Sequence, residues 1–228
     1  MRPSPLIAAG VHDSACGAEA HGGLSHVCDC LWTWTYYTGV MGMDGGEASR
    51  VDRRTADELS LAELVAEDFR THDKELTSPG FWAVATHHVG ERIDRIGSPL
   101  VRRPLTVLHT AAATAVDWVW GIHVPRGTKL GRRVHIWHFG STLLNARAIG
   151  DDVHIRHDTT LGPVRSADRE NPEALPIIED AVELGSGTCV MGNVTVGRGA
   201  TIFANSVVLE PVPPGAKVFG VPGRIIPG

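Results

Sequence analysis

The sequence has few of the features that mark secreted, membrane or nucleic-acid-binding proteins. It holds four cysteines in 228 residues, and Cys16, Cys28 and Cys30 fall near its start, a distribution that does not make a disulfide framework. No apolar run reaches the roughly 20 residues of a transmembrane helix, and no secretory signal opens the chain. No cluster of Lys and Arg predicts a nucleic-acid-binding surface. We therefore expect a cytoplasmic protein with neither a membrane nor a nucleic acid as its partner.

The first 50 residues carry little that predicts a folded domain. Residues 31–43 are apolar and aromatic, but Gly39 and Gly42 interrupt this short stretch. His26, Cys28 and Cys30 could supply half of a metal site, but no second Cys/His pair completes it. We interpret residues 1–50 as a poorly ordered extension that contributes little to function.

Residues 51–120 show helical patterns. Ser60 and Glu63 form a capping-box sequence at the start of one helix, and an apolar face follows it: Leu61, Leu64, Val65 and Phe69. Pro79, after a serine, marks the start of a second helix. A third helix is predicted to begin at Pro104 and to end at Gly121. The sequence thus predicts a short helical domain over residues 51–120.

Residues 121–228 follow a repeat of six residues. An aliphatic residue recurs at each step, at Ile178, Leu184, Val190, Val196, Ile202 and Val208. Six is the period of neither a helix nor a strand, and a fixed short period indicates stacked coils. Three flat faces of about six residues make one coil, with the aliphatic side chains inward. The repeat is lost over residues 163–177, and a long loop in a compact repeat is often functional, so we interpret it as a lid rather than a tolerated surface insertion.

This region resembles the left-handed parallel β-helix of the hexapeptide-repeat acyltransferases, and among them the serine acetyltransferases. The matching stretches include Gly121-Ile122, Lys129-Leu130-Gly131, Thr160-Leu161-Gly162, Gly192-Asn193, Val196-Gly197-Arg198-Gly199-Ala200 and Gly220-Val221-Pro222-Gly223-Arg224. Trp137-His138-Phe139-Gly140 resembles relatives from polysaccharide and secondary-metabolite pathways more than the housekeeping enzyme. The resemblance implies a mainly β fold, a left-handed β-helix preceded by a short helical domain. It also implies transfer of acetyl from acetyl-CoA to a hydroxyl of a small polar acceptor.

Acetyl transfer needs a base for the acceptor and hydrogen-bond donors for the oxyanion. His138 matches the catalytic histidine of the family, which implies that it is the base. The family orients this histidine with an aspartate fifteen residues earlier, where this chain has His123. Asp117, Asp151 or Asp158 could supply the missing carboxylate, a backbone carbonyl could orient His138, or the enzyme could be inactive. Most of the other histidines between residues 123 and 157, which are His123, His135, His154 and His157, are expected to face outward from strands.

The acceptor site departs from that of the serine enzymes. They carry an aspartate before the catalytic histidine, where this chain has Trp137. An indole offers an apolar wall with a polar tip, which suits a sugar or a pathway intermediate better than free serine. Arg169, in the loop, could pair with a carboxylate, and Asp158 is a further candidate for binding the acceptor.

CoA is expected to lie in a groove between coils, because small residues there let the ligand approach the backbone closely. The candidates for its pantetheine arm are Gly162, Gly185, Ser186, Gly187 and Gly192, and those for its phosphates are Arg198, Thr201 and Arg224. The resemblance implies a homotrimer, or two such trimers paired, with no metal. Three alternatives stay open: an N-acetyltransferase, a zinc enzyme like the γ-carbonic anhydrases, and an inactive scaffold.

Overall fold

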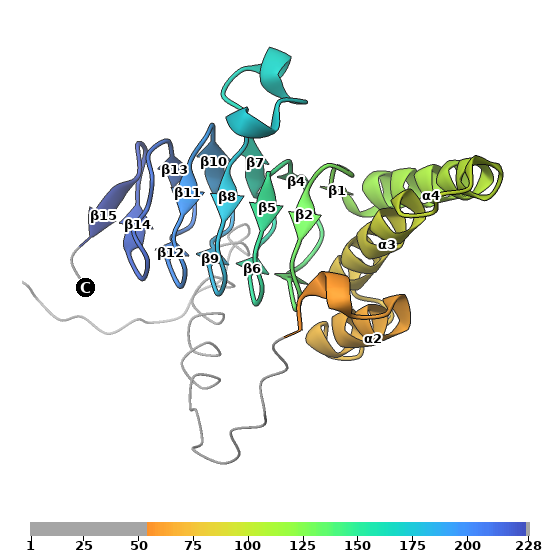
Figure 1. Ribbon diagram of the computed structural model, residues 1–228. Helices are drawn as coiled ribbons and strands as arrows, with labels where there is room; N and C mark the ends of the chain where they lie inside the picture. Colours follow the sequence, from red (N-terminus) through yellow and green to blue (C-terminus); the bar gives the residue numbers. More distant parts are fainter. Residues whose placement is uncertain (1–53, 227–228) are drawn as a thin grey trace, which may run out of the picture. The chain divides into compact units, whose positions relative to one another are not determined.

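A computed structural model describes residues 54–226, which belong to one compact unit (Figure 1). The predicted N-terminal extension, with His26, Cys28 and Cys30, lies outside the described residues. The helices are η1 (Ala56–Glu58), α2 (Leu61–Thr71), α3 (Pro79–Asp94) and α4 (Pro99–Trp120), with short turns η2 (Ser166–Asp168) and η3 (Pro172–Ala174) in the later loop.

Short strands follow the helices. They are β1 (Ile122–His123), β2 (Lys129–Leu130), β3 (His135–Ile136), β4 (Thr142–Leu144), β5 (Ala148–Ile149), β6 (His154–Ile155), β7 (Thr160–Gly162), β8 (Ile177–Ile178), β9 (Glu183–Leu184), β10 (Cys189–Met191), β11 (Thr195–Val196), β12 (Thr201–Ile202), β13 (Val207–Val208), β14 (Lys217–Phe219) and β15 (Arg224–Ile226).

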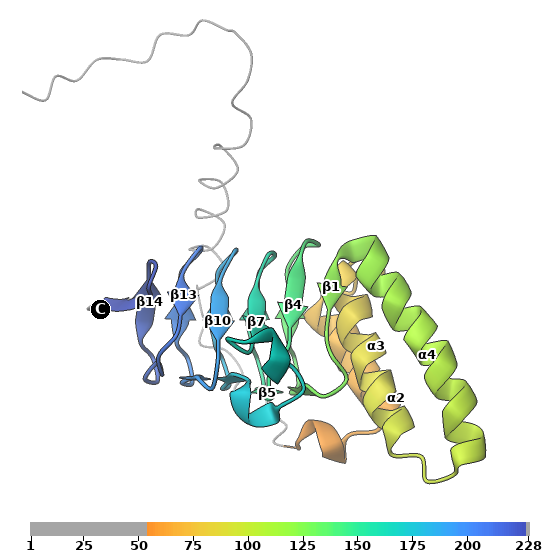
Figure 2. The same cartoon turned by 90° about the horizontal axis from the view of Figure 1, so that it is seen from above.

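The strands form the left-handed parallel β-helix that the six-residue repeat predicts. They fall in turn on three faces: a first sheet of β1, β4, β7, β10 and β13, a second of β2, β5, β8 and β11, and a third of β3, β6, β9, β12, β14 and β15. Figure 2 shows these coils side by side along one axis, with the helices at the β1 end. Cys189 pairs with Val207, so one coil is three hexapeptides. The step from Thr160 to its partner Cys189 is longer, because the loop over residues 163–177 enlarges that coil.

The inward positions of the repeat form the core. Every aliphatic residue of the predicted series is at most 2% exposed: Ile178, Leu184, Val190, Val196, Ile202 and Val208. Each stacks on its counterpart in the next coil, as Val190 does between Leu161 and Val208. Burial of one such side chain stabilises the fold by about 1.5–3 kcal/mol, so the apolar column explains why the period of six specifies the coil.

Two of the three helices begin where the sequence predicts. The capping box at α2 is formed, since Ser60 Oγ accepts from Glu63 N (3.3 Å) and Glu63 Oε2 accepts from Ser60 N (2.9 Å). The second helix, α3, starts at Pro79. The predicted start of the third helix at Pro104 is wrong, because α4 starts at Pro99 and holds Pro104 inside. Both prolines lie in the first two turns of α4. Pro99 takes the first helical position, which proline prefers because its missing N–H would have no partner there.

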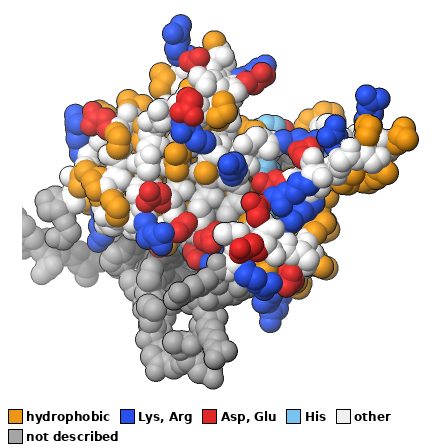
Figure 3. Space-filling view, viewed as in Figure 1, with side chains coloured by type: hydrophobic (Ala, Val, Ile, Leu, Met, Phe, Trp, Pro, Cys, Tyr) orange, Lys and Arg blue, Asp and Glu red, His pale blue; other side chains and the backbone are white. Residues whose placement is uncertain are grey.

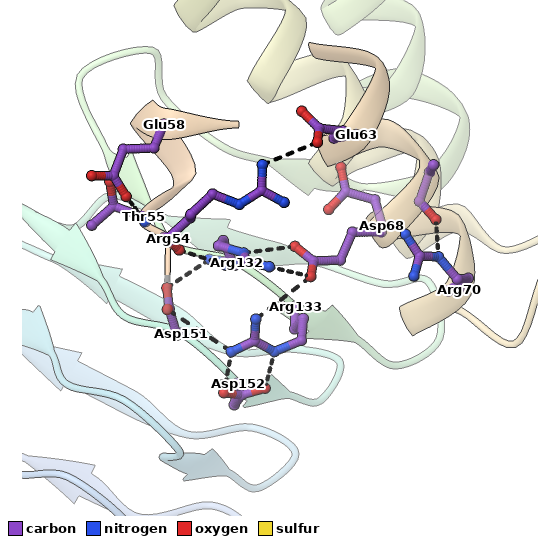
Figure 4. A network of polar contacts seen from close by, with 12 residues as sticks. Arg54, Thr55, Glu58, Glu63, Asp68, Arg70, Arg132, Arg133, Asp151 and Asp152 are labelled. Carbon is purple, nitrogen blue, oxygen red and sulfur yellow. Dashed lines mark hydrogen bonds and ion pairs between the residues drawn. The ribbon is translucent and has the colours of Figure 1, made fainter. Parts of the chain in front are cut away.

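A buried ion pair ties α2 to the first coils (Figure 4). The Arg132 side chain is 3% exposed, and its guanidinium donates to both carboxylate oxygens of Glu67, at 2.9 and 2.7 Å. Arg133, beside it, forms a two-bond pair with Asp152. Arg132 N also donates to Asp151 Oδ1 (2.8 Å). This network fixes the helical part on the coils that carry the histidines.

The outer side of α4 is apolar and exposed. Leu100, Val107 and Leu108 are 87%, 72% and 68% exposed, and Figure 3 shows hydrophobic side chains along this helix. No helix in the described part of the chain is long and apolar enough to cross a membrane.

The loop between β7 and β8 is held to the coils at its base. Arg147 Nε donates to the carbonyl of Pro172 (2.8 Å), and the Arg147 guanidinium pairs with Glu173 (3.1 Å). Asn145 donates to the carbonyl of Arg169 (3.2 Å). These contacts leave the Arg169 side chain itself exposed.

Candidate active site

One corner of the β-helix gathers the chemically active side chains. It consists of the turns from the third sheet to the first, residues 137–141, 156–159, 185–188 and 203–206, and is called here the His138 corner. Backbone hydrogen bonds join consecutive turns: Gly187 N donates to the carbonyl of His157 (3.1 Å), and Asn205 N donates to the carbonyl of Ser186 (2.8 Å). Side chains from separate hexapeptides therefore form a column along the corner.

His138 sits in an unusual backbone conformation at the top of this column. Its φ is +64° and its side chain is exposed, although left-handed backbone is uncommon for residues other than glycine. The turn is held in place because Gly140 N donates to the carbonyl of Trp120 (3.0 Å) and Thr142 N to that of Gly121 (2.8 Å). A tightly held left-handed residue is typical of functional sites.

The surroundings of His138 keep its imidazole neutral. Partial burial, and then the nearby His157 and the positive charge of Arg156, lower the pKa of His138 below its ordinary 6.5. The His138 and His157 rings lie 5.9 Å apart, nearly edge to face. A neutral imidazole near pH 7 has a free lone pair, which a general base requires.

His157 extends the site to the next coil. Its Nδ1 lies 3.5 Å from the hydroxyl of Ser186, one of the residues predicted to line the CoA groove. Ser186 and Gly187 therefore share a corner with His138. His157 was not among the predicted site residues, although the spacing that pairs His135 with His154 on neighbouring coils also separates His138 from His157.

His123 has a carboxylate partner. Its Nδ1 lies 3.1 Å from Asp117 Oδ2, one turn before the end of α4. Asp117 was one of the three residues that, from the sequence, could supply the carboxylate missing at position 123. Its Oδ2 can only accept when ionised, so His123 Nδ1 carries a hydrogen and Nε2 of the neutral ring is an acceptor. Among residues 54–226, no hydrogen bond joins His123 to His138; His123 lies opposite Leu143 in the pairing of β1 with β4, the strand that follows the His138 turn.

Trp137 belongs to an aromatic stack on the third sheet. Its indole stacks on His135 with ring centres 4.0 Å apart, and its Nε1 donates to His154 Nδ1 (3.3 Å). His135 also contacts His72 of α2, at 4.7 Å. The expectation that His135 faces outward is wrong, because it is 8% exposed. Burial, followed by the neighbouring His72, His154 and His138, lowers the pKa of His135 to about 3, so the wall beside His138 is uncharged.

Asp158 supports the turn that carries His138. Its Oδ1 accepts from Ser141 N (3.2 Å). A side chain at Gly140 would come within 3.2 Å of the same oxygen, and Gly140 has φ +148°. Asp158 was predicted to bind the acceptor; the structure gives its carboxylate a contact with the backbone.

The other predicted site residues are spread over different corners. Arg198 lies where the second sheet turns into the third, and pairs with Asp180 (2.8 Å). Gly162 and Gly192 bond to each other (2.8 Å) at the edge from which the loop with Arg169 leaves. Gly185 lies at the His138 corner, and Thr201 and Arg224 lie in the third sheet. One chain therefore does not bring Arg169, Arg198 and His138 to the same corner.

No group of three His, Cys, Asp or Glu side chains is placed to hold a metal ion within residues 54–226.

Coils of three hexapeptides, an inward aliphatic column and a histidine turn at one corner define a left-handed β-helix of the hexapeptide-repeat class. Comparison with known proteins agrees, although no family model matches the chain. It is 35% identical over 149 residues to the serine acetyltransferase of Mycobacterium tuberculosis, covering 65% of this chain and 61% of that protein. It is 35% identical over 152 residues to that of Bacillus licheniformis, covering 66% of each. The soybean serine acetyltransferase apoenzyme superposes with a TM-score of 0.61 at 27% identity, over 73% of this chain and 69% of that one.

The chain belongs to the serine acetyltransferase-like members of the hexapeptide-repeat acyltransferase family. It spans somewhat less than two thirds of the length of the two curated relatives named above.

Proposed function

We propose that this protein is an acetyl-CoA-dependent O-acetyltransferase in which His138 is the general base. The observation that supports this most is the His138 turn: an exposed, neutral imidazole on a tightly held left-handed residue, at the same corner as the CoA-groove candidates Ser186 and Gly187, with His157 between them. His138 Nε2 or Nδ1 takes the proton from the acceptor hydroxyl as its oxygen attacks the thioester carbonyl. The tetrahedral intermediate then collapses, the C–S bond breaks, and the proton passes to the CoA thiolate.

The Asp117–His123 pair takes the place of the family's aspartate in this proposal. A single carboxylate beside the base stabilises the imidazolium that forms during transfer. Here the negative charge of Asp117 acts through His123, whose free Nε2 can accept from a protonated neighbour. This makes Asp117 a positioning residue rather than a catalytic one.

The acceptor is proposed to be a small polar molecule other than free serine, such as a sugar or a pathway intermediate. Trp137 has no charge with which to bind the ammonium of an amino acid, and its indole is held rigidly by His135 and His154. A fixed aromatic face suits the apolar face of a ring. N-acetylation is the second candidate, because the same base can take a proton from an ammonium acceptor, after which the lone pair of the neutral amine attacks the thioester carbonyl.

A trimer would complete the site. Arg169 and Arg198 lie at corners other than that of His138 within one chain. In a threefold assembly, each interface joins unlike corners of two neighbouring prisms. We propose that the loop with Arg169 reaches the His138 corner of a neighbouring subunit.

The pH dependence of CoA release tests the role of His138. The active form is the neutral base, and the pKa of His138 is lowered, so activity should be flat from about pH 7 upward and fall only below the ordinary histidine value of about 6.5. Arg156→Gln removes one of the charges that lower this pKa, so its acidic limb should move to higher pH. An acidic limb above pH 7 in the unmodified protein would exclude His138 in this environment as the base.

Asp117→Asn tests whether the negative charge of Asp117 acts on His138 through His123. The amide keeps the shape but loses the charge, so kcat should fall about 10–100-fold while the KM for acetyl-CoA stays within about twofold. The acidic limb of the pH–activity profile should also move, because His123 loses its anionic partner. A kcat within about twofold of the original, with an unmoved limb, would show that Asp117 has only a structural role.

A further inference from the structure

A cleft outside the His138 corner lies between α3, α4 and β1. Its volume is about 360 Å³, which falls within the range of small-molecule sites. Ala83 and Thr86 of α3 form one wall, and the face of α4 from His109 to Asp117 forms another. His123 of β1 closes it, and Figure 2 shows the three elements adjacent to one another.

His109 lines this cleft and is almost fully buried. The residue is 7% exposed, and its Nε2 donates to the carbonyl of Thr86 (2.9 Å). Since a carbonyl only accepts, Nε2 carries the hydrogen and Nδ1 is left with a lone pair. That Nδ1 is buried and has no hydrogen-bond partner within the described part of the chain. This nitrogen is inaccessible from the cleft, so the polar contacts of a ligand come from the other side chains that line it.

Three polar side chains of the cleft, Thr110, Thr114 and Asp117, offer acceptors. Thr110 Oγ1 donates to the carbonyl of Thr106 (2.8 Å), and Thr114 Oγ1 to that of Thr110 (2.7 Å). Each hydroxyl has thus used its hydrogen and keeps its lone pairs. Asp117 adds a carboxylate, of which Oδ2 faces His123. The cleft therefore favours a ligand that carries hydrogens on nitrogen or oxygen.

The apolar walls of the cleft and the charge of Asp117 narrow the class of ligand further. Ala83, Ala113, Val116 and Ile122 give the cleft an apolar lining. Arg126, at its edge, is engaged by Asp94 and lies 3.4 Å from the carbonyl of Gly90. The carboxylate of Asp117 attracts an ammonium group and repels a carboxylate.

We propose that this cleft binds a small amino alcohol with an aliphatic or ring-shaped body and no carboxylate. Its ammonium lies toward Asp117, its hydroxyl donates to the lone pairs of Thr110 Oγ1 or Thr114 Oγ1, and its carbon skeleton packs on the alanines of α3 and α4. This binding does not depend on the proposed function.

The test compares two probes of equal shape and opposite charge, in the full chain and without acetyl-CoA. trans-4-Aminocyclohexanol should bind with a dissociation constant of about 1 mM, a realistic affinity for so few atoms. trans-4-Hydroxycyclohexanecarboxylate should bind at least about tenfold more weakly, a difference of about 1.4 kcal/mol. Titration calorimetry measures both. Equal affinities, or no heat from either probe, would overturn the proposal.

Two variants of α4 locate the bound probe. Ala113→Phe fills the cleft and should weaken binding of the amino alcohol at least about tenfold. Ala112→Phe is the matched control, because Ala112 is exposed and does not line the cleft, and it should bind like the unmodified chain. Equal binding to both variants would place the probe elsewhere and contradict the proposal. Because acetyl-CoA is absent, this result is independent of whether the protein transfers acetyl groups.

Discussion

Replacing His138 by Asn should lower CoA release from acetyl-CoA about 10²–10⁴-fold, the contribution of a positioned general base. The KM for acetyl-CoA should change little, because the imidazole acts on the acceptor. Asn is chosen because it tolerates the left-handed backbone of His138, φ +64°, yet its amide cannot take up a proton near neutral pH.

A second substitution separates the loss of the base from the effect of the left-handed backbone at residue 138 on stability. His138→Ala removes the base as well, but alanine adopts a positive φ less readily, so this variant should be both inactive and less stable by about 1 kcal/mol. Thermal unfolding of both variants shows whether the turn is intact. If the His138→Asn variant keeps more than about a tenth of the original rate, His138 is not the base.

Glu67→Gln should lower the free energy of unfolding by about 1.5–3 kcal/mol, because it removes the negative charge that two nitrogens of the buried Arg132 guanidinium contact. The Arg132 side chain is 3% exposed and that of Glu67 14% exposed. Burial raises the pKa of Glu67, but its bonds with Arg132 and the charge of Arg133 outweigh this, so the pKa is lowered overall from 4.5. The stability that this pair supplies is therefore present near neutral pH and is lost as the pH falls below about 4.5.

Glu170→Gln is the matched control for that substitution. It makes the same chemical change at a side chain that is 88% exposed and paired with Arg169 at 3.7 Å, so the free energy of unfolding in urea should shift by less than about 0.5 kcal/mol. A loss below about 1 kcal/mol for Glu67→Gln would mean that the helices do not depend on this pair for their attachment to the coils.

The sequence predicts the coil because its signal is local and repeated. Each of Ile178, Leu184 and Val190 points inward six residues after the last, and each is at most 1% exposed. No long-range information is needed to place them. The capping box at Ser60 and Glu63 is also a local signal, and it is confirmed for the same reason.

The start of α4 shows where local signals compete. Pro99 and Pro104 both suit the first turns of a helix, but only Pro99 follows a serine, the same start signal that marks α3 at Pro79. The structure resolves the competition because Arg102 N donates to the carbonyl of Ser98 (2.9 Å), which begins the helix at the earlier proline.

The site was only partly predictable, because its contacts join residues from different coils and elements. Asp117 ends a helix and His123 begins a strand, so their 3.1 Å contact depends on the turn at Gly121, which has φ +68°. His135 becomes buried because α2 places His72 against it, a contact between residues far apart in the sequence. The roles of His138, Trp137 and the CoA-groove candidates remain predictions that the experiments above test.

The most direct measurement is CoA release from acetyl-CoA by the unmodified protein across a panel of serine, homoserine, sugars and amino alcohols, with the product identified by its added mass of one acetyl group. We predict turnover with a carboxylate-free acceptor, little with serine, and loss of turnover in His138→Asn. Failure of the protein to bind acetyl-CoA at all would contradict the assignment of this β-helix as an acetyltransferase.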